Sequence, residues 1–241
     1  MATPDPTRPG GEARSEEGSP TRSTYHHGDL RRALLEAGTA LARQGGPDAV
    51  ALRGATRVVG VSANAAYRHF ADRDALLDEV VSLAQAAAAD VISTSVETTT
   101  AGLPADATDA DRARARFRAV GVGYLRFAMD EPGLFRTAFA VPTDLRRSGA
   151  AEAAGASGRT PYQLLSDMLD EMLSAGALPP TQRPGAEFLA WSAVHGLAML
   201  TLEGPLRDLP AEVVEGLVPR LVGMVDLGLG LVRSETPDSP S

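Results

Sequence analysis

Residues 52–70, LRGATRVVGVSANAAYRHF, hold the feature that most limits how this chain can fold. Gly60 lies between Val59 and Val61, and a glycine there lets the backbone leave a helix in the left-handed conformation that β-branched residues adopt only at a cost. Ser62 follows, and its hydroxyl can accept a hydrogen bond from the free amides that open a new helix. The stretch therefore predicts two short helices joined by a tight turn.

The second of these helices, residues 63–69, has the composition of a helix that enters a DNA groove. A helix, a glycine-containing turn and a helix together present a recognition helix to the major groove. The small alanines permit close approach to base edges, and Asn64 can pair with adenine. The side chains of Tyr67, Arg68 and His69 can donate hydrogen bonds to phosphates. The residues expected at the DNA here are Ser62, Ala63, Asn64, Ala65, Tyr67, Arg68 and His69. The alternative is a pair of ordinary core helices, with Tyr67 and Phe70 buried.

The sequence VGVSANAAYRHFADRDALL resembles the helix-turn-helix signature of the TetR family of bacterial transcriptional regulators, with matching residues Gly60, Val61, Ser62, Tyr67, Phe70 and Leu76. Upstream, YHHGDLRRALLEAG is similar to the start of the first helix in one TetR subgroup. The resemblance implies an all-α fold with an N-terminal three-helix DNA-binding domain and a C-terminal helical domain for ligand binding and dimerisation. It also implies that Tyr25, His26 and His27 approach the phosphate backbone.

Two departures from the family pattern concern DNA recognition. The usual Lys after the recognition helix is Arg73 here, and the frequent Gly within that helix is Asn64. The first change keeps the positive charge but alters its geometry, since Arg and Lys meet phosphate differently. We therefore interpret Asn64 as a base-reading residue and expect Arg53 and Arg73 among the DNA contacts.

The charge of the chain argues against a strongly basic, non-specific nucleic-acid binder. The net charge is -8, and in residues 25–81 the arginines and the acidic residues are equal in number. A groove-binding module needs only a local positive face, however, and can carry an acidic domain behind it. DNA affinity is therefore expected to come from helix N-termini, a few Arg contacts and dimerisation.

Composition also limits the chemistry of the chain. It contains no Cys, which excludes disulfides and thiolate metal sites. His26 and His27 are adjacent but have no further ligand at metal spacing, so we expect neither a metal nor a cofactor. No nucleophile and base can be paired, which argues against an enzyme. No apolar run approaches the roughly 18 to 20 residues of a membrane span, and a cytoplasmic protein is expected.

Changes in composition predict four parts: a disordered N-terminal arm (1–24), the DNA-binding domain (25–81), a C-terminal helical domain (82–233) and a disordered tail (234–241). Periodicity and capping residues predict helices over residues 29–43 with Asp29 as N-cap, about 73–96 with Asp72 as N-cap, 111–129, 132–139, 161–176, 184–202, and 210–232 with a kink at Pro219. Residues 98–110 read as a loop and 142–158 as a mobile connection. The helix that begins at Arg73 is expected to link the two domains mechanically.

The segment FLAWSAVHGLAML resembles the Trp-His-Gly motif in the C-terminal domain of the same TetR subgroup, here Trp191, His195 and Gly196. Trp191 and His195 are four residues apart and share a helix face. Either Trp191 is core with His195 as its hydrogen-bonded neighbour, or both contact a ligand. If a pocket exists, the predicted lining is Tyr124, Phe127, Phe135, Phe139, Tyr162, Met168, Met172, Trp191, His195 and Met199, which suits a small apolar or aromatic effector.

The last helix carries an apolar stripe broader than one core requires, with Gly216, Gly223 and Gly228 permitting close helix packing. A dimer interface is the natural use, and the resemblance implies a homodimer formed by the last two long helices of each subunit. The expected function is that of a repressor that binds double-stranded DNA at a palindromic operator and is released by an effector. The alternative is a DNA-binding dimer that answers to a partner protein or to no effector.

Overall fold

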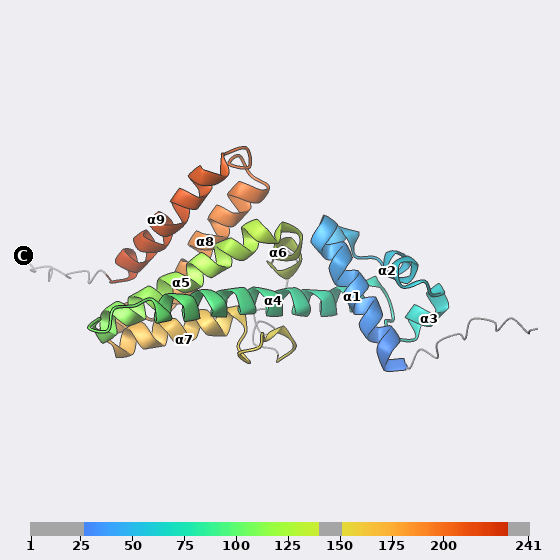
Figure 1. The fold of residues 1–241 in the computed structure, drawn as a ribbon, viewed down its shortest axis with the longest axis horizontal. Coiled ribbons are helices and arrows are strands. Elements are labelled where there is room, and N and C mark those ends of the chain that lie inside the picture. The colour runs from blue at the N-terminus through green and yellow to red at the C-terminus, as the bar shows by residue number, and fades with distance from the viewer. Residues whose placement is uncertain (1–26, 140–150, 231–241) are drawn as a thin grey trace, which may run out of the picture.

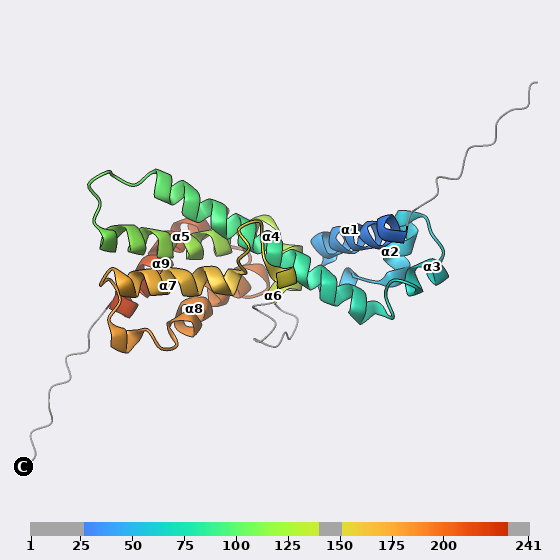
Figure 2. The same cartoon turned by 90° about the horizontal axis from the view of Figure 1, so that it is seen from below.

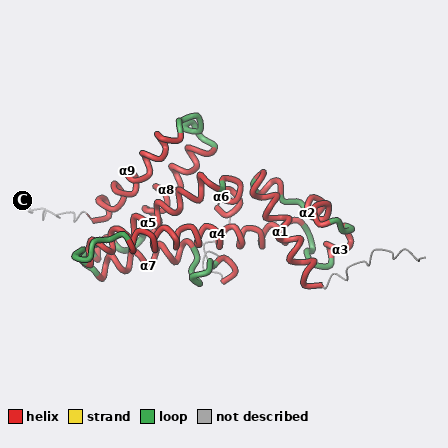
Figure 3. Tube along the Cα trace, in the orientation of Figure 1, coloured by secondary structure: helices red, strands yellow, loops and turns green. Residues whose placement is uncertain are grey.

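The computed structural model describes residues 27–139 and 151–230, and in these ranges every regular element is helical (Figures 1 and 3). The predicted disordered arm and tail lie outside the described residues. The helices are α1 (His27–Gly45), α2 (Leu52–Val59), α3 (Ala63–Tyr67), α4 (Arg73–Ala101), α5 (Asp109–Asp130), α6 (Pro132–Phe139), α7 (Pro161–Ser174), α8 (Ala186–Leu202) and α9 (Ala211–Gly230), with short 3-10 turns η1 (Pro47–Ala49), η3 (Ala151–Ala153) and η4 (Pro180–Gln182).

Helices α1 to α3 form a small unit at one end of the molecule, closed by the first turns of α4 (Figure 1). Its core contains Leu34, Val50, Phe70 and Leu76, all of which are fully or almost fully buried. These residues come from four different segments, so the unit has a hydrophobic core of its own. The predicted all-α architecture with an N-terminal helix-turn-helix unit is confirmed.

Helix α4 runs from this unit along the whole of the C-terminal part (Figures 1 and 2). Asp72 caps it as predicted, because its carboxylate accepts a hydrogen bond from Ala75 N at 2.8 Å. The prediction that the helix ends near residue 96 is wrong, since it continues to Ala101. Gly102, Pro104 and the small polar residues near them suggested a loop from residue 98, but the Thr100 hydroxyl donates to Val96 O at 2.7 Å and so bonds within the helix.

Two other predicted boundaries change for identifiable reasons. Asp29 does not cap α1, which begins at His27, but lies in its first turn, where a negative charge also favours the helix dipole. Helix α5 begins two residues earlier than predicted because Thr108 accepts from Asp111 N at 3.1 Å and caps it. The connecting loop is therefore short, residues 102–108.

The connection before α7 was predicted to be mobile, and the part of it that the structure describes is tied to α4. Asp90 accepts a hydrogen bond from Ala156 N at 2.7 Å, and the hydroxyls of Ser93 and Ser157 lie 3.3 Å apart. Residues 140–150 of that predicted segment lie outside the described residues. The described part holds α7 against α4.

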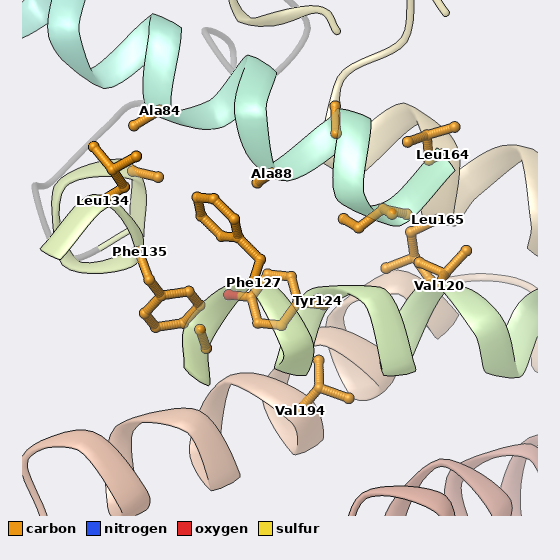
Figure 4. Close-up of a cluster of buried hydrophobic side chains, with 14 of the residues drawn as sticks. Ala84, Ala88, Val120, Tyr124, Phe127, Leu134, Phe135, Leu164, Leu165 and Val194 are labelled. Carbon is orange, nitrogen blue, oxygen red and sulfur yellow. The ribbon is translucent and has the colours of Figure 1, made fainter. Parts of the chain in front are cut away.

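Helix α5 is the centre of the C-terminal part, with contacts to α4, α6, α7, α8 and α9 (Figure 2). A Cβ atom on Gly123 would lie 2.8 Å from Ile92 Cα, so α4 and α5 meet with their backbones in contact. The small side chain of Ala88 on α4 leaves room for the ring of Phe127, which rises from α5 toward it (Figure 4). The alanine-rich sequence of α4 is thus explained by the aromatic residues that it covers.

Helix α9 is fixed to α5 by a buried carboxylate. Asp226 is 0% exposed and accepts hydrogen bonds from Arg114 Nη1 and Arg118 Nε, both at 2.7 Å. Arg114 also donates to Ala177 O at 3.0 Å, which adds the turn after α7 to the same network. Among the described helices, none combines the length and the apolar character that a bilayer crossing requires.

Candidate functional site

The turn between α2 and α3 has the predicted geometry. Gly60 adopts φ 77°, and its amide donates to Thr56 O, which ends α2. Ser62 accepts a weak hydrogen bond from Ala65 N at 3.4 Å and opens α3. Helix α3 is shorter than predicted, because it ends at Tyr67 with Arg68 as C-cap, and the His69 amide bonds Ala66 O as the chain turns away.

Helix α3 presents almost all of its predicted DNA residues at the surface. Ser62, Ala63, Asn64, Tyr67 and Arg68 are exposed, while Ala65 and His69 are partly buried and Ala66 is buried. Tyr67 is 54% exposed and Phe70 only 1%, so the alternative in which both rings fill a core does not hold. The structure thus gathers the predicted residues on one short exposed segment.

The arginines of residues 27–81 fall into two groups. Four are engaged within the fold: Arg31 with Glu79, Arg32 with Asp29 and Glu36, Arg43 with Glu131, and Arg73 with backbone carbonyls and Asp74. The other three, Arg53, Arg57 and Arg68, are exposed and form no ion pair with any described residue. All three belong to the α2–α3 segment, which makes this the positive face of the unit.

Two of these arginines differ from the sequence-based prediction. Arg73 Nε donates to Val50 O at 2.8 Å and Nη2 to Pro47 O at 2.7 Å, so its guanidinium fixes the turn η1. Its contact with DNA stays a prediction. Arg57 was not predicted as a site residue, although it lies one helical turn after Arg53 on the same face of α2. That spacing was the available signal. Tyr25 and His26 lie outside the described residues, and of His27 only the helical backbone is described.

Five of the predicted lining residues meet in one aromatic cluster, which we define as Tyr124, Phe135, Phe139, Trp191 and His195. Tyr124 is buried at its centre, with its ring 5.4 Å from that of Phe135 and 5.0 Å from that of Phe139. Trp191 Nε1 donates to Tyr124 Oη at 3.0 Å, and a second hydrogen bond joins Tyr124 Oη and His195 Nδ1 at 2.9 Å. The hydrogen bond predicted between Trp191 and His195 is therefore not direct, because the hydroxyl of Tyr124 lies between them and joins them.

Both titratable groups of the aromatic cluster are held neutral. Burial raises the pKa of the Tyr124 hydroxyl well above its usual value, although the hydrogen bond from Trp191 opposes that shift. Burial also lowers the pKa of His195. Because both shifts disfavour charge, the cluster is suited to uncharged partners.

The other predicted lining residues lie elsewhere around the cluster. Phe127 points toward Ala88 of α4 (Figure 4). Met168 and Met172 are buried on α7, where Tyr162 occupies the first turn and is partly buried. Met199 is partly buried on α8, one turn beyond His195. Their contact with a ligand stays a prediction.

Helix α6 connects the aromatic cluster to the helix-turn-helix unit. Phe135 and Phe139 project from it into the cluster. At its other end, a Cβ on Gly133 would lie 2.7 Å from the carbonyl carbon of Arg43, so α6 abuts the last turn of α1. Arg43 Nε donates to Glu131 Oε2 at 2.8 Å beside this contact. The two regions are thus linked by α6 as well as by α4.

Helices α8 and α9 present an apolar face that residues 27–139 and 151–230 leave uncovered. Leu189 and Leu227 are each 63% exposed and Met224 is 68% exposed. A Cβ on Gly216, Gly223 or Gly228 would meet nothing within 4 Å. Large apolar side chains next to open small residues are typical of a surface that packs against another helix.

Two known families match the sequence, and together the matches cover more than half of the chain. Residues 34–80 match the family described as "Bacterial regulatory proteins, tetR family". Residues 117–225 match the family described as "Tetracyclin repressor-like, C-terminal domain". No curated protein matches the sequence.

Solved structures of two bacterial proteins are similar to this chain. A protein of unknown function from Rhodococcus sp. RHA1 is 27% identical, with 87% of this chain and 100% of that chain covered and a TM-score of 0.63. A TetR family transcription regulator from Marinobacter aquaeolei VT8 is 20% identical, with coverage of 81% and 94% and a TM-score of 0.51. The second likeness is one of fold alone.

Proposed function

The chain belongs to the TetR family of transcriptional regulators, and we propose that it is a homodimeric repressor that binds a palindromic operator and leaves it when a small molecule binds. The observation that carries the proposal is the group of three exposed arginines on the helix-turn-helix, Arg53, Arg57 and Arg68, which have no ion-pair partner in the described part of the chain. Unpaired guanidinium groups beside an exposed recognition helix can bind phosphate without breaking ion pairs of the fold. Such a protein works where the DNA is, in the cytoplasm.

Asn64 is the proposed base-reading residue. It is exposed in the first turn of α3, beside residues small enough for close approach to a base edge. An Asn side chain can form two hydrogen bonds to adenine, which contribute roughly 1 to 3 kcal/mol of discrimination. In a two-fold symmetric dimer, the two recognition helices would read half-sites about 34 to 36 Å apart or a multiple of this.

The apolar face of α8 and α9 is the proposed dimer interface. Leu189, Met224 and Leu227 would be buried there, and the open glycines of α9 would allow the partner helices to approach closely. Burial of apolar area of this kind is what stabilises obligate homodimers. The partner is therefore a second copy of the same chain.

The proposed effector is a small apolar or aromatic molecule that binds at the aromatic cluster. Helix α6 contributes Phe135 and Phe139 to that cluster and abuts α1 at Gly133. A ligand that displaced α6 would therefore disturb α1 as well as the helix α4 that carries the recognition unit. The difference between the ligand's affinities for the displaced and the undisplaced position of α6 would set how much of the protein leaves the DNA.

The test is selection of bound DNA from a random duplex pool, followed by titration of the selected site at two salt concentrations and a mass measurement of the complex. An inverted repeat bound by two subunits with a moderate salt slope is the expected result. The Asn64→Ala variant should lose preference at one base pair of each half-site, while Arg32→Ala, which removes an ion-paired surface arginine, should bind normally. If nothing is enriched, or Asn64→Ala selects the same site equally well, the operator-reading assignment is wrong.

A further inference from the structure

The hydrogen bonds of the aromatic cluster have a direction that follows from the chemistry of its members. The Trp191 indole nitrogen can only donate, so the Tyr124 oxygen accepts from it. Tyr124 has one proton of its own, and the only other polar group that the described residues place on its oxygen is His195 Nδ1, at 2.9 Å. The order of donation from Trp191 to Tyr124 is therefore fixed, and the remaining question is the direction of the second bond.

Donation from Tyr124 to His195 gives the Trp191 N–H, the buried Tyr124 hydroxyl and His195 Nδ1 each a hydrogen-bond partner. In the opposite arrangement, His195 Nδ1 would carry the proton and donate to Tyr124, and the buried Tyr124 hydroxyl proton would have no acceptor among the described residues. Leaving a buried donor unsatisfied costs roughly 1 to 3 kcal/mol, so the first arrangement is preferred. His195 is then neutral with its proton on Nε2, a state that its burial also favours.

The series of hydrogen bonds from Trp191 through Tyr124 thus ends at the Nε2–H group of His195. His195 Nε2 has no hydrogen-bond partner among the described residues, and the ring is only partly buried. Apolar rings flank it: the centroid of Phe135 lies 5.7 Å away at an interplanar angle of 30°, and that of Trp191 lies 5.9 Å away. Among the described residues, the cluster therefore offers one directed N–H donor beside aromatic rings.

We propose that His195 Nε2–H donates a hydrogen bond to a neutral carbonyl oxygen of the effector, whose apolar or aromatic skeleton packs on the partly buried rings of Phe139 and Trp191. This inference rests on the proposed effector site and names the chemical class of its ligand: a ketone, ester or lactone. A carboxylate fits less well, because a negative charge would favour the imidazolium, which needs a proton on the nitrogen that already accepts from Tyr124. A ligand with an ammonium group also fits less well, because that group has no lone pair to accept a hydrogen bond from His195 Nε2–H.

The first test reads the tautomer of His195 in the ligand-free protein by long-range nitrogen–proton correlation spectra, with the His195 signals identified by their loss in His195→Gln. The expected state is the Nε2–H tautomer, and Tyr124→Phe should reduce its population because the donor to Nδ1 is gone. Tyr162→Phe removes a hydroxyl outside the cluster and should change nothing. A dominant Nδ1–H tautomer, or a Tyr124→Phe spectrum identical to that of the wild type, overturns the inference.

The second test compares three probes of one size: acetophenone, ethylbenzene and benzoate. Their binding is followed by the shifts of His195 Nε2–H and of the indole proton of Trp191, which is unique because the chain has one Trp. Acetophenone should bind about tenfold more tightly than the other two, and His195→Phe should abolish that advantage while keeping an aromatic ring. Equal affinities, preference for benzoate, or absence of binding by acetophenone overturns the inference.

These outcomes are separable from failure of the proposed function. If an operator is selected but acetophenone shows no advantage, the repressor proposal stands and the carbonyl assignment is wrong. If acetophenone binds as expected but no DNA site is enriched, the ligand site stands and the operator proposal is wrong.

Discussion

Arginine has opposite uses at the two ends of the molecule. In the α2–α3 segment, three arginines are exposed and have no partner among the described residues. In α5, four arginines within seven positions are all engaged: Arg112 with loop carbonyls, Arg114 and Arg118 with Asp226, and Arg116 with Glu171. Arginine side chains are thus left exposed in the first region, whereas in the second they join helices and loops of the fold.

The difference lies in where the acceptors are. On α5, Arg112 meets carbonyls of the preceding loop, whereas Arg114, Arg116 and Arg118 meet carboxylates from distant helices, of which that of Asp226 lies in the interior. In the N-terminal unit, Glu79 and Glu36 are paired with Arg31 and Arg32, and no described acidic side chain lies within ion-pair distance of Arg53, Arg57 or Arg68. Net charge therefore does not show where a positive face lies, whereas the arginines without an ion-pair partner among the described residues locate one.

The largest expected effect is that of Asp226→Ala. It removes a fully buried carboxylate and leaves Arg114 and Arg118 without their ion-pair partner, so α9 loses both of its ion pairs to α5. Both arginines are partly exposed and can regain water, so we expect the free energy of unfolding to fall by about 3 kcal/mol, at the lower end for a broken buried pair. Urea denaturation measures it.

The matched control is Asp208→Ala, an exposed carboxylate near the adjacent Arg207 at 3.6 Å. It should change stability by less than about 0.5 kcal/mol. If the two variants were equally stable, the description of α5 as a helix whose arginines hold the fold would be wrong.

The next largest effect concerns the joint between the two regions. A methyl group on Gly133 would enter the backbone carbonyls of Ala42 and Arg43, which cannot move without disturbing α1. We expect Gly133→Ala to lower the free energy of unfolding by about 2 kcal/mol, as overpacking does, and to separate the unfolding of the two regions. Gly102→Ala, whose new methyl would make only ordinary contacts, should be near neutral. Calorimetry that showed one unchanged transition for Gly133→Ala would contradict the role of this joint.

What could be predicted from the sequence depends on how local the determinants are. The Gly60 turn, the Ser62 cap and the Asp72 cap each depend on residues within three or four positions, and all three were predicted. The hydroxyl of Tyr124 bonds Trp191, which lies 67 positions later in the chain, and His195, which lies 71 positions later. No pattern along the chain indicates these contacts. The same holds for Arg73, whose carbonyl acceptors lie 23 and 26 residues away.

A smaller effect is expected from Arg57→Ala, which tests the free arginines directly. Arg57 is exposed and makes no ion pair with a described residue, so stability should change by less than about 0.5 kcal/mol. DNA affinity should fall for all sequences alike, and the slope of log affinity against log salt should decrease by about one. A filter-binding salt series on the selected operator and on a scrambled duplex measures both. Arg32→Ala, the ion-paired counterpart, should keep the slope of the wild type.

The smallest effect concerns pH, and it belongs to the buried region alone. Burial holds the pKa of His195 below its usual value, so the unfolded chain binds a proton more readily than the folded one. Stability from this residue is fully present above pH about 6.5, the pKa of an unperturbed His, and is lost as the pH falls toward the lower folded pKa. Denaturation at neutral and mildly acidic pH should therefore show a smaller loss on acidification in His195→Gln than in the wild type. If the wild type and His195→Gln lost equal stability on acidification, His195 would not be held neutral in the folded protein. The aromatic cluster would then not differ in this respect from the exposed, charged α2–α3 segment.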